Sequence, residues 1–298
     1  MSSRRRVRRT SNATVAVFLA PTFILLGVFL ILPIVQSFQL SFTDWDGVAP
    51  VQQQVGLANW QELAHDPTFW LSVKNSFLLA SVSLIIQIPI GLALAVLLDR
   101  GGRKFKVFKV GFFVPLLMSS VAVAFLFQGV FDFNFGLLNS LLNTLHLDAY
   151  AQDWLGDPNY AIWAVLSVVS WQFIPFYMLL FLAAMQGIPT ELREASMIDG
   201  ANKRQYTFGI QIPLIKGAIA TAALLIIIGS LKYFDLIWVM TAGGPDHATT
   251  VMATYMYESA FKANRVGYGA AIASAMFLIV FTVSLAVMWL SRRSEKTS

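Results

Sequence analysis

The stretch Glu-Ala-Ser-Met-Ile-Asp-Gly-Ala occupies residues 194–201 and leads to Ile-Gln-Ile-Pro at 210–213, between two long apolar runs. Gly200 predicts the end of a short helix, because glycine adopts the left-handed conformation beyond a helix without steric cost. Asn202 predicts the start of a second helix, since Gln205 follows at the spacing of a capping box. These residues therefore predict two short helices, joined by a tight turn and held beside a membrane.

Apolar composition places the rest of the chain in a membrane. Of its 298 residues 57% are hydrophobic and only 12% are charged, with a mean hydropathy of +0.65. Several uncharged runs exceed the roughly 20 residues that a bilayer core requires. We interpret residues 1–298 as one transmembrane domain, in which the N-terminal run is the first span and residues 188–213 form a cytoplasmic loop. The predicted spans are about 15–38, 73–98, 110–131, 161–185, 214–240 and 267–291.

The distribution of basic residues predicts the orientation of these spans. With the N-terminus inside, 17 of the 21 Lys and Arg residues fall in cytoplasmic segments, among them the run from Arg4 to Arg9. The positive-inside rule then places both termini and the 188–213 loop in the cytoplasm. The net charge of +5 is thus a sign of topology, and we do not read it as a nucleic-acid footprint.

The 194–213 stretch resembles the EAA loop of ABC importer permeases, in particular those of the carbohydrate family (maltose/oligosaccharide and glycerol-phosphate type). In that family the loop docks into a cleft on the cytoplasmic ATPase. Ser196 stands where the family usually has alanine, and Arg204 and Thr207 stand where bulky aromatics are common. The alternative is an ordinary cytoplasmic loop with two amphipathic turns. The resemblance assigns ATPase coupling to Glu194, Ala195, Asp199, Gly200, Ala201, Tyr206, Phe208 and Pro213.

Two charged residues in the fifth apolar run are candidates for a substrate path. Lys232 and Asp235 would each cost about 2.5 to 3.5 kcal/mol at the bilayer centre, so we place them in its outer third. Their spacing puts them on one face of a continuous helix, where they form either a structural ion pair or part of a path. Aromatic faces and hydrogen-bonding groups suit a sugar. In the oligosaccharide branch that this region resembles, the corresponding span helps to line the sugar path.

Four further residues complete this candidate path. The sixth span opens with many small residues at 267–274, which favour close helix packing, although two of its polar side chains could also face the path. The candidate path residues are Lys232, Tyr233, Asp235, Trp238, Tyr268 and Ser274.

The resemblance extends from Leu40 to Phe261 and implies an all-α fold of six transmembrane helices, the type I ABC importer permease (MetI-like) fold. It implies import of di- or oligosaccharides across a prokaryotic inner membrane, with glycerol phosphate as the alternative cargo. The implied partners are a second permease subunit, two ABC ATPase subunits, an extracytoplasmic sugar-binding protein and the lipid bilayer. ATP and Mg²⁺ would belong to the ATPase, and no cofactor to this chain.

Other classes of function find less support in the residues. The chain contains no P-loop, catalytic triad or cysteine, and its histidines are not spaced as metal ligands. A proton-driven secondary transporter would need ionisable residues at mid-membrane or an inverted repeat, and neither is clear here. A membrane-embedded transferase would need clustered cytoplasmic carboxylates, whereas Asp99, Glu191, Glu194 and Asp199 are dispersed. We therefore expect a transporter subunit without catalytic or metal-binding residues.

Overall fold

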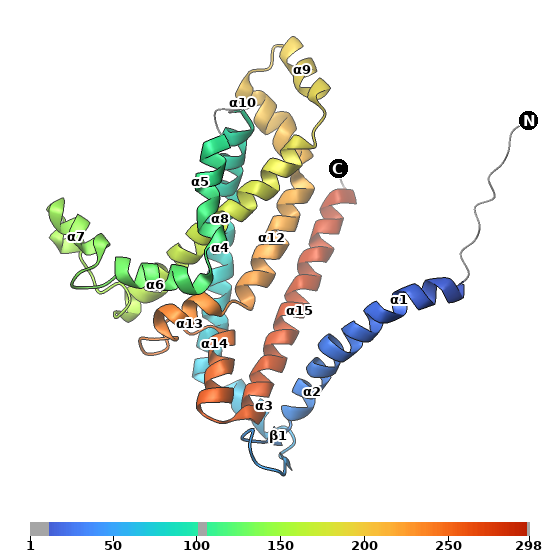
Figure 1. Ribbon diagram of the computed structural model, residues 1–298, viewed down its shortest axis with the longest axis vertical. Helices are drawn as coiled ribbons and strands as arrows, with labels where there is room; N and C mark the ends of the chain where they lie inside the picture. The colour runs from blue at the N-terminus through green and yellow to red at the C-terminus, as the bar shows by residue number, and fades with distance from the viewer. Residues whose placement is uncertain (1–11, 101–105, 297–298) are drawn as a thin grey trace, which may run out of the picture.

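The computed structural model describes residues 12–100 and 106–296, and its architecture is helical (Figure 1). The basic run from Arg4 to Arg9 and the loop 101–105 lie outside the described residues. Four long helices run beside one another: α4 (Pro67–Arg100), α8 (Pro158–Gln186), α12 (Lys216–Leu231) and α15 (Val266–Lys296). A chain of α1 (Asn12–Leu26), a π-helical turn (Gly27–Ile31) and α2 (Leu32–Leu40) diverges from them.

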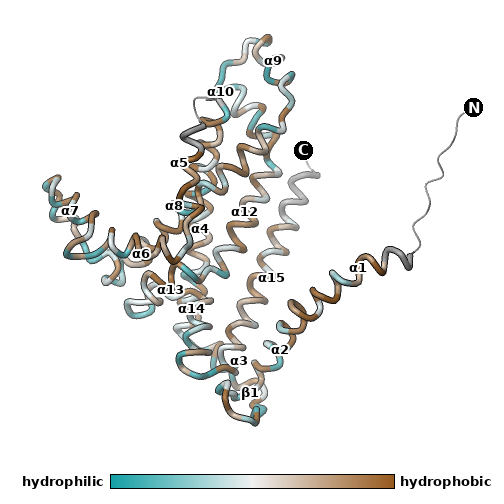
Figure 2. Tube along the Cα trace, viewed as in Figure 1, coloured by the Kyte–Doolittle hydropathy of each residue, from teal (hydrophilic) through white to brown (hydrophobic). Residues whose placement is uncertain are grey.

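The number of apolar helices agrees with the six predicted spans. Four described helices are long and apolar enough to cross a membrane, namely Ala16–Leu40, Pro67–Asp99, Pro158–Gln186 and Val266–Trp289. Two more candidates are bent pairs, Val110–Leu117 with Ser120–Val130 and Lys203–Leu214 with Lys216–Leu231. Apolar residues continue along all of these helices in Figure 2. The all-α fold of six spans is therefore confirmed, but two of the spans are broken.

The third predicted span bends by 100° between α5 (Lys106–Leu117) and α6 (Ser120–Val130). The hydroxyl of Ser119 accepts a hydrogen bond from the Ala122 N–H at 3.2 Å and caps α6. This cap supplies a partner for a backbone donor that would otherwise be exposed by the bend.

The fifth predicted span, 214–240, is not one helix. The helix α12 ends at Leu231, and α13 (Asp235–Thr241) begins only after three non-helical residues. The expectation that Lys232 and Asp235 share a helix face is therefore wrong. Among the described residues, the ion pairs within 4.0 Å do not include one between these two side chains. The break places the cation at the C-terminus of α12 and the carboxylate in the first turn of α13, where each suits the local helix dipole.

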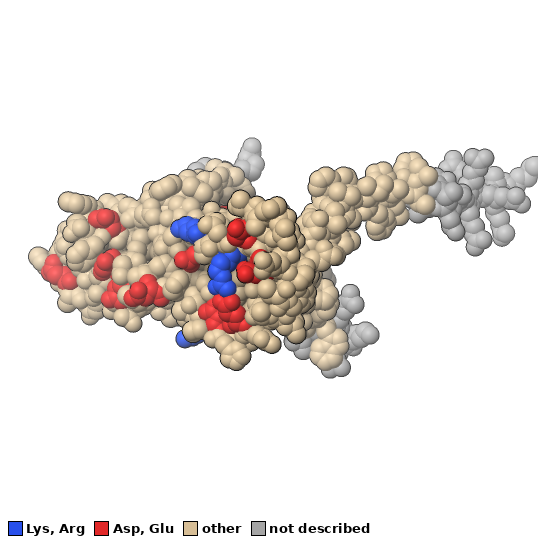
Figure 3. Space-filling model, turned by 90° about the horizontal axis from the view of Figure 1, so that it is seen from below, with Lys and Arg blue, Asp and Glu red and all other residues tan. Residues whose placement is uncertain are grey.

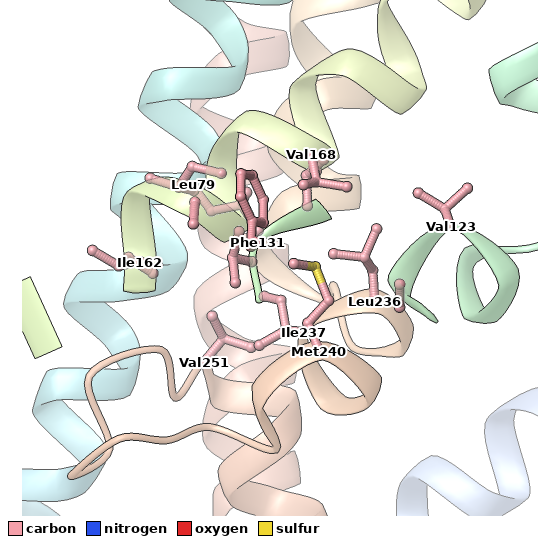
Figure 4. Packing of buried hydrophobic residues seen from close by; sticks show 14 residues of the cluster. Leu79, Val123, Phe131, Ile162, Val168, Leu236, Ile237, Met240 and Val251 are labelled. Atoms are coloured by element: carbon pink, nitrogen blue, oxygen red, sulfur yellow. The ribbon is translucent and has the colours of Figure 1, made fainter. Parts of the chain in front are cut away.

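The separate helix α13 is held by α6 and α8. Gln128 of α6 donates to the carbonyl oxygens of Val239 at 2.8 Å and Met240 at 3.0 Å, near the end of α13. Figure 4 shows Leu236 and Ile237 of α13 packed in the same hydrophobic cluster as residues of α6 and α8. Irregular backbone at membrane depth needs such protein partners for its polar groups. The amide of Gln128 supplies them at the end of α13.

Short elements lie at the lower end of the molecule in Figure 1, opposite α9, and α7 with the 3₁₀ turn after it lies to the left, beyond α6. Two-residue strands pair antiparallel, with Thr43 opposite Gln54. The elements are β1 (Thr43–Asp44), β2 (Gln53–Gln54), α3 (Ala58–His65), α7 (Leu137–Thr144), a 3₁₀ turn (Asp148–Tyr150), α14 (Met252–Tyr257) and a π-helical turn (Glu258–Lys262).

A carboxylate joins three helices at this lower end. One oxygen of Asp66 accepts from the N–H groups of Thr68 at 2.8 Å and Phe69 at 3.2 Å, at the start of α4. Its other oxygen accepts from the hydroxyls of Tyr255 in α14 and Tyr268 in α15. Burial raises the pKa of the Asp66 carboxyl, but these hydrogen bonds together outweigh burial and lower the pKa below its usual 3.8. Asp66 therefore works as an ionised acceptor that joins α4, α14 and α15.

Replacing Asp66 with asparagine is expected to destabilise this corner by about 1 to 2 kcal/mol, because charged acceptors form the stronger hydrogen bonds and the site is partly solvated. A lowered carboxyl pKa stabilises the fold above the usual value of 3.8, and this stabilisation is lost as the pH falls through the lowered pKa. The melting temperature of the purified protein should therefore depend less on pH below about 4 in the variant. The matched control is Asp44→Asn, an exposed carboxylate in β1. Equal melting temperatures of Asp66→Asn and the parent protein would contradict the role of Asp66.

Candidate functional site: a turn between two helices and a polar path

The turn after α9 (Thr190–Ile198) has the predicted left-handed glycine. Gly200 has φ +80°, its N–H bonds to the Met197 carbonyl at 3.1 Å, and the Ala201 N–H bonds to the Ser196 carbonyl at 2.9 Å. These two bonds form a Schellman motif, which satisfies carbonyl groups at the helix end. The turn is therefore fixed by backbone hydrogen bonds and requires a residue that tolerates positive φ.

The second helix has the predicted capping box. The side-chain oxygen of Asn202 accepts from the N–H groups of Arg204 at 3.0 Å and Gln205 at 2.9 Å. The Asn202 N–H donates to the Gln205 side chain at 2.7 Å. This cap starts α10 (Lys203–Tyr206), which leads through a π-helical turn (Thr207–Gln211) into α11 (Ile212–Leu214), where Pro213 lies.

The two-helix turn presents apolar side chains to the outside. Ile198 is 86% exposed, Phe208 64% and Met197 58%, at the upper end of the molecule in Figure 1. Large exposed apolar groups beside charged residues mark a surface that contacts another protein. The predicted coupling residues gather here: Glu194, Ala195, Asp199, Gly200, Phe208 and Pro213 are exposed, and Ala201 and Tyr206 are half-buried.

A small pocket of about 100 Å³ lies beneath this surface, where the turn meets the end of α4. Asp99 of α4 accepts a hydrogen bond from the side-chain amide of Gln211 at 2.9 Å. Gln211 is only 2% exposed, so this bond is shielded from water. Neither residue was predicted as a functional residue from the sequence, because no local pattern joins positions 112 residues apart.

The candidate path residues are not gathered into one site. Lys232 and Asp235 are exposed on either side of the break between α12 and α13. The ring of Tyr233 packs edge-on against that of Phe173, with 5.9 Å between the ring centres, and both rings pack against the buried cluster that contains Leu236 and Ile237. Tyr268 is buried in a different cluster, at the lower corner described above. These residues thus occupy separate surroundings in the structure.

Ser274 lies apart from that corner, further along α15. It is 1% exposed, and its hydroxyl has no hydrogen-bond partner among the described residues. The side-chain oxygen of Gln172 in α8 is likewise buried without a partner in the described chain. Such buried polar atoms need a water, a ligand or a movement to be satisfied.

Trp238 belongs to an aromatic cluster that was not predicted as a whole. Its ring stacks on that of Phe234, with 5.6 Å between the ring centres and an interplanar angle of 15°. The ring of Tyr257 meets it edge-on, with 4.8 Å between the ring centres. The ammonium of Lys262 lies 4.5 Å from the centre of the Trp238 ring. The sequence signal for half of this cluster is the i,i+4 spacing of Phe234 and Trp238. Its meeting with Tyr257 depends on the loop that joins α13 and α14.

Comparisons with known proteins agree with this geometry. The family described as "binding-protein-dependent transport system inner membrane component" matches residues 87–296. A probable ABC transporter permease protein of Pyrococcus horikoshii is 36% identical, over 95% of this chain and 97% of its own. A multiple sugar-binding transport system permease protein of Streptococcus mutans is 31% identical, over 93% and 95%. A chain of a solved bacterial alginate ABC transporter has the same fold, with a TM-score of 0.82 at 23% identity over 95% of both chains. The chain therefore belongs to the family of binding-protein-dependent transport system inner membrane components, and it is a multi-pass transporter subunit rather than an enzyme.

Proposed function

We propose that this chain is the permease subunit of an ATP-driven importer of di- or oligosaccharides and forms half of its translocation path. Three relatives that are each 31% identical support the cargo class. They are named as permease proteins for starch degradation products in Thermoanaerobacterium thermosulfurigenes, for multiple sugars in Streptococcus mutans and for diacetylchitobiose in Streptomyces coelicolor. The half-buried aromatic rings around Trp238, with Lys262 beside them, suit a sugar, whose C–H faces stack and whose hydroxyls need partners.

The exposed apolar surface of the α9–α10 turn is the observation that carries the mechanism. In this proposal Ile198, Met197 and Phe208 enter the cleft of a partner ATPase, and Glu194 meets it with its carboxylate. ATP and Mg²⁺ are bound by two copies of that ATPase. The glycine turn lets the two short helices move as one unit, so that closure of the ATPase pair pulls on α12 and its neighbours.

A second permease subunit completes the path. The helix Ala16–Leu40 is the candidate span with none of its most apolar window buried within the chain, and it diverges from the bundle in Figures 1 and 2. We infer that one side of this helix packs on a related permease and the other meets lipid. Exposed Phe18, Phe23 and Phe29 supply the contact area.

The two ends of the molecule support the predicted orientation. Basic residues concentrate in the segments that we place in the cytoplasm, where the α9–α10 turn lies. Residues 132–157 carry four aspartates and no Lys or Arg, and Figure 3 shows acidic side chains gathered on the lower face. In this proposal the lower face is extracytoplasmic and receives the sugar-binding protein, and both termini are cytoplasmic.

The test is binding-protein-dependent ATP hydrolysis by the complex reconstituted with its partner permease and ATPase. Stimulation should appear with one class of sugar across a panel of di- and oligosaccharides that also includes glycerol phosphate. Glu194→Lys should assemble normally and lose stimulation, because it reverses the charge that faces the ATPase. If only glycerol phosphate stimulated hydrolysis, the cargo would be glycerol phosphate and not a sugar. Transport without any ATPase in the complex would overturn the proposal.

A further inference from the structure

The end of α4 nearest the α9–α10 turn is bonded to the π-helical turn, Thr207–Gln211, that follows α10. Asp99, in the last turn of α4, accepts from the Gln211 side chain at 2.9 Å. Gln211 closes the π-helical turn that follows α10, and its side chain is buried. A shift of the turn therefore displaces the acceptor on α4, or breaks a shielded hydrogen bond.

The other end of α4 is bonded to the loop between α13 and α14. The side-chain amide of Asn75 donates to the carbonyl oxygens of Ala248 at 3.0 Å and Thr250 at 2.9 Å. The hydroxyl of Ser76 accepts from the Met252 N–H at 3.1 Å, at the start of α14. Asn75 is 5% exposed and Ser76 is fully buried, so these bonds are also shielded.

The loop held by Asn75 is itself stiff. The Thr249 hydroxyl donates to the Gly244 carbonyl at 2.8 Å, and the Thr250 hydroxyl donates to the Gly243 carbonyl at 3.1 Å. Both threonines are fully buried. The loop follows α13, which carries Trp238, and it precedes α14, which carries Tyr257. A displacement of the loop therefore changes how the two halves of the aromatic cluster meet.

Between these contacts α4 runs without interruption for about 36 Å, given a rise of about 1.5 Å per residue from Asn75 to Asp99. It is braced by α8. A Cβ on Gly91 would lie 3.1 Å from the backbone nitrogen of Met178, so the two backbones approach closely at this point. Pro89, which cannot donate a backbone hydrogen bond, lies two residues before this close approach.

We propose that α4 mechanically links the ATPase-facing turn to the lower loop, and that Asp99, Gln211 and Asn75 are the positioning residues of this link. Movement of the turn shifts α4 through the Asp99–Gln211 bond, and α4 moves the 243–251 loop through Asn75. The proposal rests on the proposed function, because the movement originates in the ATPase. The contact is distinct from the exposed surface that docks the ATPase.

The test measures the ratio of binding-protein-stimulated to basal ATP hydrolysis in the complete reconstituted complex. Gln211→Glu places a second carboxylate against Asp99, and Asn75→Asp replaces a donor with a carboxylate that faces two carbonyl oxygens. Each is expected to lower the ratio about tenfold with basal hydrolysis unchanged. Gln211→Met removes the bond without adding charge and should give a similar loss. The control Gln53→Glu, on the exposed strand β2, should keep the parental ratio.

Two combined variants separate a link from local stabilisation. Gln211→Glu with Asp99→Asn restores a hydrogen bond of reversed polarity and should recover the ratio. Gln211→Glu with Asn75→Asp should lose no more than the worse single variant, because the two contacts act in series. A parental ratio in Gln211→Met would overturn the inference. So would a ratio that stays low in Gln211→Glu with Asp99→Asn, or losses that multiply in Gln211→Glu with Asn75→Asp. Absence of stimulation in the parent complex would instead overturn the proposed function itself.

Discussion

Replacing Gly200 with valine is expected to abolish ATPase coupling while the membrane helices remain assembled. Gly200 has φ +80°, a region that β-branched side chains avoid. The cost of about 1 to 2 kcal/mol exceeds what the short Schellman turn can absorb, so the turn should open and displace α9 from α10. Copurification of the ATPase with the permease should be lost, together with stimulated ATP hydrolysis.

The control for this prediction is Gly200→Asn, because asparagine tolerates the left-handed conformation. A Cβ at this position would meet nothing within 4 Å, so the valine acts through backbone conformation rather than through a clash. Gly200→Asn should therefore keep most of the coupling. Equal activity of the valine and asparagine variants would show that positive φ at this turn is unimportant.

The α9–α10 turn could be predicted from the sequence because its determinants are local. A left-handed glycine ends one helix, and an asparagine with a glutamine three residues later starts the next. Each signal acts within a few residues of the backbone groups that it satisfies. Tertiary contacts were not needed to place Gly200 or Asn202.

The broken spans could not be predicted in the same way. Hydropathy reports the apolar length of 214–240, and the break after Leu231 leaves this length unchanged. The separate helix α13 depends on Gln128, which lies 111 residues before the carbonyl that it binds. Likewise Asp66 meets Tyr268 across 202 positions, so a tyrosine interpreted as a path residue lies in a structural corner. Such contacts follow from packing, which a pattern of residues along one segment does not report.

Small residues at the start of α15 were predicted to permit close packing, and the structure confirms this for two glycines. A Cβ on Gly267 would lie 1.9 Å from the carbonyl oxygen of Thr43, and one on Gly269 would lie 2.5 Å from the Cβ of Ala260. The Gly267 N–H also bonds to the Trp45 carbonyl at 2.9 Å. The backbone of α15 therefore contacts the β1 segment directly.

Gly267→Ala is consequently expected to destabilise the protein by about 3 kcal/mol or more, at the upper end for an overpacked site, because the obstacle is backbone and not a flexible side chain. The lower end of α15 must move away from β1, which also breaks the bond to Trp45. The measurement is the melting temperature and the rate of proteolysis of the purified complex. The matched control is Gly229→Ala in α12, where a Cβ meets nothing within 4 Å and alanine should stabilise the helix by about 0.5 to 1 kcal/mol. If the melting temperature of Gly267→Ala equalled that of Gly229→Ala, the close contact of α15 with β1 would be contradicted. The packing of α15 beside Asp66 would then have to differ from the packing described above.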